Sequence, residues 1–216
     1  MKKKNFCLMV LLALTTLTAT AQDAKRPEVL METSMGNLRI QLYNETPQHR
    51  DNFLRLVSEH FYDSLSFHRV IKDFMVQGGR ANGAKTGRVA EMSTVEPEFR
   101  LPQLFHKRGA LAAAREGDDV NPEKRSSPTQ FYFVWGRKYS ERAMEFTENR
   151  LDLKLTPEMR QAYMTEGGTP HLDGSYTVFG QVIEGLDVLE RMQAAATDQA
   201  DCPLEPIVIL RATVVE

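Results

Sequence analysis

The sequence predicts a β-rich domain in which short antiparallel strands close into a barrel. Short stretches rich in β-branched and aromatic residues recur along the chain, and only two helical segments with apolar stripes accompany them. No repeat of about 20–50 residues indicates a solenoid or a propeller. The 216 residues are enough to bury one substantial core.

Composition excludes several classes of protein. Lys and Arg number 27 against 29 Asp and Glu, so the chain lacks the positive field typical of nucleic-acid binders. Two cysteines exclude a disulfide scaffold, and we expect Cys202 to be partly buried and inert. No nucleotide loop, G-x-S-x-G or histidine pair with zinc-binding spacing is present. We therefore expect neither a metal nor a cofactor, and no nucleic-acid partner.

Residues 1–21 have the pattern of an export signal. Lysines at positions 2–4 precede the apolar stretch Phe6–Leu14, and Ala-Thr-Ala at 19–21 supplies the small residues that a signal peptidase reads. The apolar run is shorter than the roughly 20 residues of a membrane-spanning helix, although an uncleaved anchor is the alternative. We expect cleavage after Ala21 and no membrane span afterwards. A flexible leader over residues 22–27 and one domain over 28–216 would follow, in the periplasm or otherwise exported.

The first elements of the domain are a hairpin and a helix. Val29–Thr33 and Leu38–Leu42 predict the hairpin, because apolar and polar residues alternate in the second segment as in a half-buried strand. Thr46-Pro47 predicts a helix start, with Thr as N-cap and Pro at the first helical position. Phe53, Leu56 and Val57 would form its apolar stripe.

The remaining core elements are mostly strands. A second core helix fits Leu186–Ala194. Strands are expected at Ser66–Val70, Phe74–Gln77, Ala110–Ala114, Phe131–Trp135, Thr177–Val182 and Ile207–Val215.

Residues 136–167 depart from the β pattern. The block is highly charged, and Thr156-Pro157 begins a helix whose apolar stripe would be Met159, Ala162 and Tyr163. We interpret it as a helical insertion on the surface of the barrel. It would cap one end of a groove, dock a partner or only stabilise the domain.

The stretch FHRVIKDFMVQGG over Phe67–Gly79 resembles the signature of the cyclophilins, the β-barrel peptidyl-prolyl cis-trans isomerases or rotamases. Gly109–Ala114, Pro128–Phe133 and His171–Gly180 resemble three further segments of that family, in the family's order. The resemblance covers roughly residues 28–135 and 168–215. It implies an all-β-dominated fold, a closed eight-stranded antiparallel barrel capped by two helices, with the 136–167 helical insertion as an addition.

The chemistry of prolyl isomerisation explains why an arginine would be needed. The barrier of ~18–20 kcal/mol comes from amide resonance, and uncatalysed exchange takes tens to hundreds of seconds. In the twisted transition state the prolyl nitrogen gains a lone pair, so a donor aimed at it stabilises the transition state alone. Arg69 suits this role because its fork is rigid and always charged. A surface salt bridge is the alternative role for Arg69.

The resemblance also implies a set of site residues. Arg69 and Gln77 would be catalytic, whereas His68 is expected to be structural and not a base. The substrate-binding residues would be Phe74, Met75, Tyr132 and Leu172 as an apolar cup, Ala114, Arg115 and Gln130 along the peptide, and His171 and Tyr176 at the rim. For the apolar members, a place in the barrel core is the alternative.

Three of these residues depart from the family pattern. His171 replaces the usual Trp, and Tyr132 replaces a Phe, so the Tyr132 hydroxyl needs a partner or costs about 1–3 kcal/mol. Arg115 brings a charge close to the expected groove, which predicts a preference for acidic residues flanking the proline.

The sequence therefore predicts a monomeric, cofactor-free peptidyl-prolyl isomerase that acts on proline-containing exported polypeptides. The alternative is a peptide-binding chaperone with the cyclophilin fold and little catalysis. The presence of Arg69 favours the enzyme, since a binding module has no use for a donor to the transition state.

Overall fold

The computed structural model describes residues 25–215, so the expected signal over residues 1–21 lies outside the described residues. All neighbouring strands pair antiparallel, in the order β3-β9-β1-β2-β8-β6-β7-β5-β4. The strands within this part of the chain are β1 (Glu28–Thr33), β2 (Gly36–Leu42), β3 (Ser66–Phe67), β4 (Arg69–Ile71), β5 (Met75–Gly78), β6 (Ala110–Ala113), β7 (Phe131–Val134), β8 (Val178–Glu184) and β9 (Ile207–Val215).

The sheet closes through the stretch Ser66–Ile71. Its first half, β3, pairs with β9, and its second half, β4, pairs with β5, so the two edges of the sheet belong to one continuous piece of chain. His68 interrupts the pairing between them. The predicted closed antiparallel barrel is confirmed; nine strands are found instead of eight because the expected strand Ser66–Val70 divides at His68.

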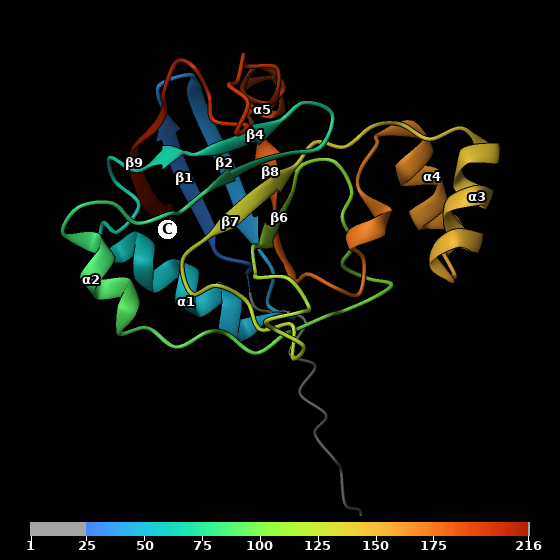
Figure 1. Cartoon of the computed structure of the whole chain (residues 1–216), viewed down its shortest axis with the longest axis horizontal. Helices are drawn as coiled ribbons and strands as arrows, with labels where there is room; N and C mark the ends of the chain where they lie inside the picture. The colour runs from blue at the N-terminus through green and yellow to red at the C-terminus, as the bar shows by residue number, and fades with distance from the viewer. Residues whose placement is uncertain (1–24, 216) are drawn as a thin grey trace, which may run out of the picture.

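Two helices cap the barrel as expected. Figure 1 shows α1 (Pro47–Ser58) and α5 (Leu186–Gln193) on opposite sides of the sheet. The apolar stripe of α1 is buried, with Phe53, Leu56 and Val57 each at most 2% exposed. Two short elements were missed by the sequence prediction, α2 (Lys85–Ala90) and the 3-10 helix η1 (Pro170–Leu172). Helix α2 buries no residue, so no apolar period marks it.

The block 136–167 is helical, as predicted. It contains α3 (Glu141–Leu151) and α4 (Pro157–Thr165), which lie together at one end of the molecule in Figure 1, away from α2. Met144, Met159 and Tyr163 form a small apolar cluster between these helices and the barrel. The cluster is separate from the main core of the barrel.

Strands β5 and β7 are buried on both faces. Val76 and Phe133 point into the main core inside the barrel, whereas Met75 and Tyr132 belong to a second apolar cluster on the outside. Because side chains alternate between the faces of a strand, one pair of strands supplies both clusters. The outer cluster is where the predicted site residues gather.

Two statements about the described residues complete the fold. Cys202 lies exposed in the loop before β9, so the expectation that it is partly buried is wrong. Within residues 25–215, no helix is both long and apolar enough to cross a membrane.

Candidate functional site

Strand register places the first members of the site in one row. Arg69 on β4 lies opposite Gln77 on β5, and Gln77 lies opposite Tyr132 on β7. Tyr132 in turn lies opposite Ala112 on β6. Residues directly opposite each other in a sheet share a face, so these side chains lie on the outer surface of the barrel.

A hollow of about 170 Å³ opens above this row. Its apolar lining from Phe74, Met75, Leu172 and Tyr132 has the character of a cup. The structure brings nine of the predicted site residues to this hollow: Arg69, Phe74, Met75, Gln77, Ala114, Arg115, Tyr132, Leu172 and Tyr176.

The other two predicted residues border the hollow without lining it. Gln130 accepts a hydrogen bond of 3.2 Å from Gln77 Nε2 and lines an adjoining hollow of about 490 Å³. The ring of His171 stacks on Phe74, with 5.5 Å between the ring centres. Both therefore extend the groove on either side of the cup.

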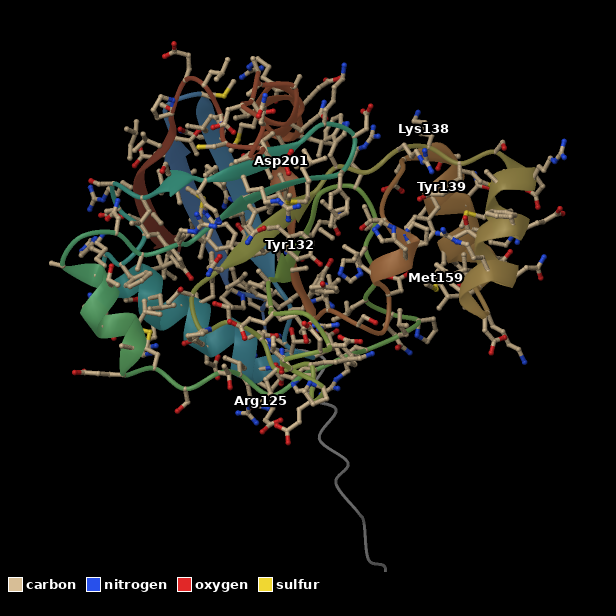
Figure 2. All side chains as sticks on the ribbon, in the orientation of Figure 1. Arg125, Tyr132, Lys138, Tyr139, Met159 and Asp201 are labelled. Atoms are coloured by element: carbon tan, nitrogen blue, oxygen red, sulfur yellow. The ribbon has the colours of Figure 1, made fainter. Side chains whose placement is uncertain are left out.

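The guanidinium of Arg69 lies at the edge of the cup. The side chain is 44% exposed, and its Nε lies 3.4 Å from a carboxylate oxygen of Asp201. Figure 2 shows Asp201 near β4, in the loop that follows α5. Sequence reasoning missed Asp201, because it belongs to no motif and lies 132 residues from Arg69. The contact is the surface salt bridge expected as the alternative role of Arg69, but it engages Nε alone and leaves the other guanidinium donors for a substrate.

Arg115 is already committed to partners within the protein. Its side chain is only 4% exposed, Nε donates to the Ser175 carbonyl at 2.7 Å, and Nη1 pairs with Asp118 at 2.6 Å. The guanidinium also lies 4.5 Å above the centre of the Tyr176 ring. This geometry argues against the expectation that Arg115 selects acidic residues, since its charge is neutralised where it stands.

The sequence indicated that the Tyr132 hydroxyl needs a hydrogen-bond partner. The structure provides one beneath the cup. The hydroxyl lies 3.0 Å from His106 Nε2, and His106 Nδ1 lies 2.8 Å from Asp173 Oδ1. The Tyr163 hydroxyl of α4 donates to the other oxygen of Asp173. Burial, together with Tyr176 and Asp173 nearby, raises the pKa of Tyr132 well above its ordinary value, so it remains a phenol. We call this series of contacts the cup chain.

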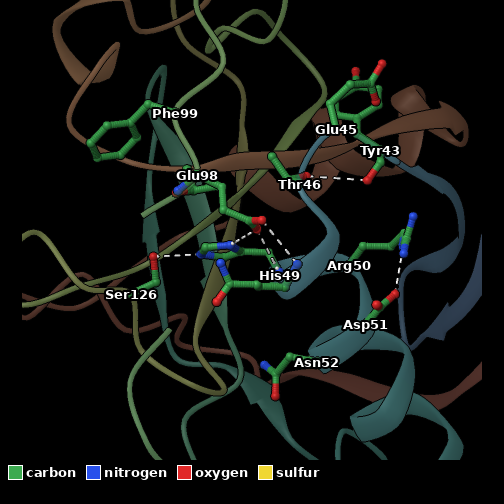
Figure 3. A network of polar contacts seen from close by, with 12 residues as sticks. Tyr43, Glu45, Thr46, His49, Arg50, Asp51, Asn52, Glu98, Phe99 and Ser126 are labelled. Carbon is green, nitrogen blue, oxygen red and sulfur yellow. Dashed lines mark hydrogen bonds and ion pairs between the residues drawn. The ribbon is translucent and has the colours of Figure 1, made fainter. Parts of the chain in front are cut away.

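A second chain of the same kind lies at the start of α1. Glu98 Oε2 lies 2.7 Å from His49 Nδ1, and His49 Nε2 lies 2.9 Å from the Ser126 hydroxyl (Figure 3). The Glu98 carboxylate also accepts from the backbone N–H groups of Gln48 and His49, in the first turn of the helix. Although burial alone would raise it, these hydrogen bonds lower the pKa of Glu98. We call this series the helix chain.

The helix chain corrects one expectation. Thr46 precedes Pro47 as predicted, but its hydroxyl donates to the Tyr43 carbonyl at 3.4 Å and does not cap the helix. The carboxylate of Glu98, 50 residues away from Gln48, accepts from the first turn instead. A carboxylate at a helix N-terminus also interacts favourably with the helix dipole.

Neither chain is the nucleophilic site that its order of groups suggests. Carboxylate, histidine and hydroxyl in series are the parts of a hydrolase triad. Ser126, however, is 2% exposed and Tyr132 is 4% exposed with its hydroxyl turned to His106, so neither hydroxyl reaches a substrate. The geometry therefore favours binding and orientation over nucleophilic attack.

His68 behaves differently from both of these histidines. Neither of its ring nitrogens has a hydrogen-bond partner within the described part of the chain. Burial and the positive charges of Arg80 and Arg69 lower the pKa of His68 to about 4. The ring is neutral near pH 7, and it does not line the cup.

Taken together, the site offers an apolar cup, a cation at its edge and amide groups beside it. Such a cup fits a small apolar ring, and the polar groups on its rim fit the peptide chain that carries the ring. The arrangement can hold an extended polypeptide and place a guanidinium against one of its backbone atoms.

Known proteins are similar to this chain over nearly the whole of residues 28–215. A family model described as "Cyclophilin type peptidyl-prolyl cis-trans isomerase/CLD" matches residues 28–214. The chain is 32% identical over 198 residues to "Peptidyl-prolyl cis-trans isomerase CYP18-2" of Arabidopsis thaliana, covering 90% of this chain and 97% of the relative.

Two further similarities concern a longer protein and a solved structure. A "Putative bifunctional phosphatase/peptidyl-prolyl cis-trans isomerase" of Streptococcus pyogenes is 34% identical over 188 residues, which are 85% of this chain and 37% of that relative's length. The crystal structure of a cyclophilin type peptidyl-prolyl cis-trans isomerase of Cryptosporidium parvum, in the presence of the dipeptide Ala-Pro, matches with a TM-score of 0.62. It is 22% identical and covers 88% of this chain and 99% of its own, which shows the shared fold.

Proposed function

The chain belongs to the cyclophilin-type peptidyl-prolyl cis-trans isomerases, and we propose that Arg69 provides its catalysis. In this proposal the proline ring of a substrate sits in the cup and the peptide runs along the rim. As the imide twists, the prolyl nitrogen becomes pyramidal and accepts a hydrogen bond from the Arg69 guanidinium. The planar nitrogen of the ground state cannot accept it, so the barrier falls.

The observation that carries this proposal is the position of Arg69. Its guanidinium lies at the edge of an apolar cup lined by Phe74, Met75 and Leu172, with donors free for a ligand. Gln77, opposite Arg69 in the sheet and bonded to Gln130, would hold the substrate carbonyl beside the twisting bond. The other predicted rim residues would contact the flanking peptide.

The substitution Arg69→Ala tests the proposal. Turnover of a short Ala-Pro peptide, measured by NMR exchange between the cis and trans forms, should fall on the order of 10²-fold or more, about 2.7 kcal/mol. Arg211→Ala is the matched control, because Arg211 is an exposed arginine on β9 that lines none of these hollows. Circular dichroism should be the same for all three proteins.

Equal exchange rates in wild type and Arg69→Ala would contradict the mechanism. Peptide binding with no exchange in the wild type would favour the second candidate, a peptide-binding chaperone with little catalysis. The donors left free on Arg69 argue against that candidate, because binding alone requires only the cup and the rim.

We propose further that the protein works as a monomer on proline-containing polypeptides exported from the cytoplasm. The support is the sequence pattern of residues 1–21, with its lysines, apolar run and Ala-Thr-Ala. Expression in a Gram-negative bacterium should give a periplasmic product that begins at Gln22 by mass spectrometry. A full-length product retained in the cytoplasm would contradict export, and a dimer mass in light scattering would contradict the monomer.

A further inference from the structure

Apart from the hollow at Gln130, another hollow adjoins the cup on the side of the helical insertion, and we call it the second hollow. Its volume is about 420 Å³, and Phe74 lines both this hollow and the cup. His171 stacks on Phe74 and lines the second hollow only. A third hollow of about 390 Å³ continues from it along α3, sharing Arg137, Tyr139, Thr147 and Arg150 with the second. We call the second and third hollows together the insertion groove.

The insertion groove is lined by cations. Lys72, Arg137, Arg142 and Arg150 line it, and Asp73 is the one carboxylate among its lining residues. No ion pair between these four cations and any carboxylate occurs within residues 25–215. The chain as a whole has a net charge of −2, so this concentration of unpaired positive charge is a local feature.

Helix α3 sorts its charges between two faces. Glu141 and Glu148 pair with Arg160 of α4, on the side that faces the other helix. Arg142 and Arg150 line the groove, and Phe146, midway between them, is 66% exposed on the same face. Two of the three carboxylates of α3 are therefore paired within the insertion, whereas Glu145 is exposed, and both arginines of the helix line the groove.

The walls of the groove near the cup contain hydrogen-bonding groups that have no partner among the described residues. Arg137 lies 5.6 Å from the centre of the Tyr139 ring, and Arg150 lies 6.0 Å from that of Phe146. Neither guanidinium makes a hydrogen bond or an ion pair within residues 25–215. Thr169, 2% exposed in the same wall, has a hydroxyl with no hydrogen-bond partner in the described part of the chain. A buried hydroxyl without a partner is costly, and an oxygen of a ligand would supply one.

We propose that the insertion groove is a substrate subsite that binds the carboxylates of acidic residues a few positions from the proline. The proposal rests on the proposed function, because it is the peptide held in the cup that brings those residues past Phe74 and His171. The subsite assigns a role to the insertion: it supplies three of the four cations, Arg142 and Arg150 from α3 and Arg137 from the segment before it. It also places the acidic preference on the insertion side and not at Arg115.

Matched peptides test the subsite. Each contains Ala-Pro followed or preceded by three Glu or, as the neutral isostere, three Gln, and both dissociation constants and NMR exchange rates are measured for each. Wild type should bind the better Glu peptide about fivefold more tightly than its Gln counterpart at low ionic strength, an effect that 0.5 M salt removes. The difference should appear in the dissociation constant and KM, with kcat changed little.

The double variant Arg137→Gln/Arg150→Gln should bring the Glu-to-Gln ratio close to one. Lys138→Gln is the matched control, because Lys138 is exposed, directly follows Arg137 and lines neither hollow. Figure 2 shows Lys138 beside Tyr139 on the segment that joins the barrel to α3. This variant should retain the ratio of the wild type.

The outcomes separate the two proposals. Exchange on both peptides with a ratio of one in wild type would overturn the subsite and leave the isomerase proposal standing. Tighter binding of the Glu peptide without exchange would overturn the isomerase mechanism and support the subsite. A ratio lowered equally by Lys138→Gln and by the double variant would show a diffuse field in place of a subsite, and would also overturn it.

Discussion

The cup chain and the helix chain are two copies of one arrangement placed in different surroundings. In each, a buried carboxylate accepts from both the backbone N–H and the ring Nδ1 of one histidine, as Asp173 does from His106 and Glu98 does from His49. In each, the histidine Nε2 is hydrogen-bonded to a hydroxyl, that of Tyr132 in the cup chain and that of Ser126 in the helix chain. All the histidine and carboxylate side chains involved are at most 3% exposed.

The two chains differ in what lies beyond the last hydroxyl. Ser126 pairs with Val95 by backbone hydrogen bonds and ends the helix chain inside the structure. Tyr132 carries its hydroxyl on a ring whose other side lines the cup. The comparison teaches that the same buried contacts stabilise the start of a helix in one place and fix a wall of the binding site in the other.

Removing the carboxylate of each chain should cause the largest loss of stability. Asp173→Ala and Glu98→Ala each leave buried donors without partners, so each should lower the free energy of unfolding by about 3–5 kcal/mol in urea titrations. Exchange of an Ala-Pro peptide per folded molecule should fall only for Asp173→Ala, because its loss releases the Tyr132 ring.

Asp173→Asn and Glu98→Gln, the amides of matching size, keep the comparison measurable if the alanine variants do not fold. Equal losses of exchange per folded molecule at the two positions would show that the cup chain has no role in the binding site beyond that of the helix chain. An unchanged exchange rate in Asp173→Asn, at reduced stability, would show that the cup chain does not orient Tyr132.

Removing the hydroxyl at the end of each chain should cause a smaller loss of stability. It tests the same difference between the cup chain and the helix chain. Tyr132→Phe and Ser126→Ala each leave a buried histidine nitrogen unpaired, at a cost of about 1–3 kcal/mol by thermal or urea unfolding. Tyr132→Phe should also shift KM for the Ala-Pro peptide, since the ring is freed within the cup. A KM shift of the same size in Ser126→Ala would contradict the view that only the cup chain acts on the binding site.

His68 lacks the hydrogen-bond partners of His49 and His106. Replacing it should have the smallest effect on stability, and that effect should depend on pH. Its pKa in the folded protein is about 4, below its ordinary value of 6.5, so the unfolded chain binds the proton more readily. The contribution of His68 to the free energy of unfolding is therefore highest above pH 6.5, where the ring is neutral in both states, and it decreases as the pH falls toward about 4.

Replacing His68 by Leu should therefore flatten the dependence of the urea midpoint on pH between about 6.5 and 4. An identical slope in His68→Leu and wild type would remove the role assigned to this ring.

Local patterns predicted the strands, and the resemblance of Phe67–Gly79 to the cyclophilin signature implied Phe74 and Met75 of the cup, because both signals lie among neighbours in sequence. Alternation identified β2, and one stretch of thirteen residues contains Arg69, Phe74, Met75 and Gln77. Phe67–Gly79 brings them together through a single hairpin, so their spacing in sequence already determines their spacing in space.

Contacts across long separations could not be predicted in this way. The sequence showed that the Tyr132 hydroxyl needs a partner, but His106 lies 26 residues away and Asp173 a further 67 from His106. Glu98 replaces Thr46 as the acceptor at α1 for the same reason: its position depends on how the whole barrel closes. A single sequence contains no local pattern for such pairs.

The two ends of the helical insertion meet at Gly136 and Gly168. A side chain on Gly136 would collide with the Gly168 carbonyl oxygen, and Arg137 bridges to Gly168 next to it. The chain thus enters and leaves the lobe at one point, so the lobe could be excised there without rethreading any strand. Tyr163 would leave with it and deprive Asp173 of a donor. Asp173 would keep both donors from His106 on one oxygen, and its other oxygen would need a new donor or water.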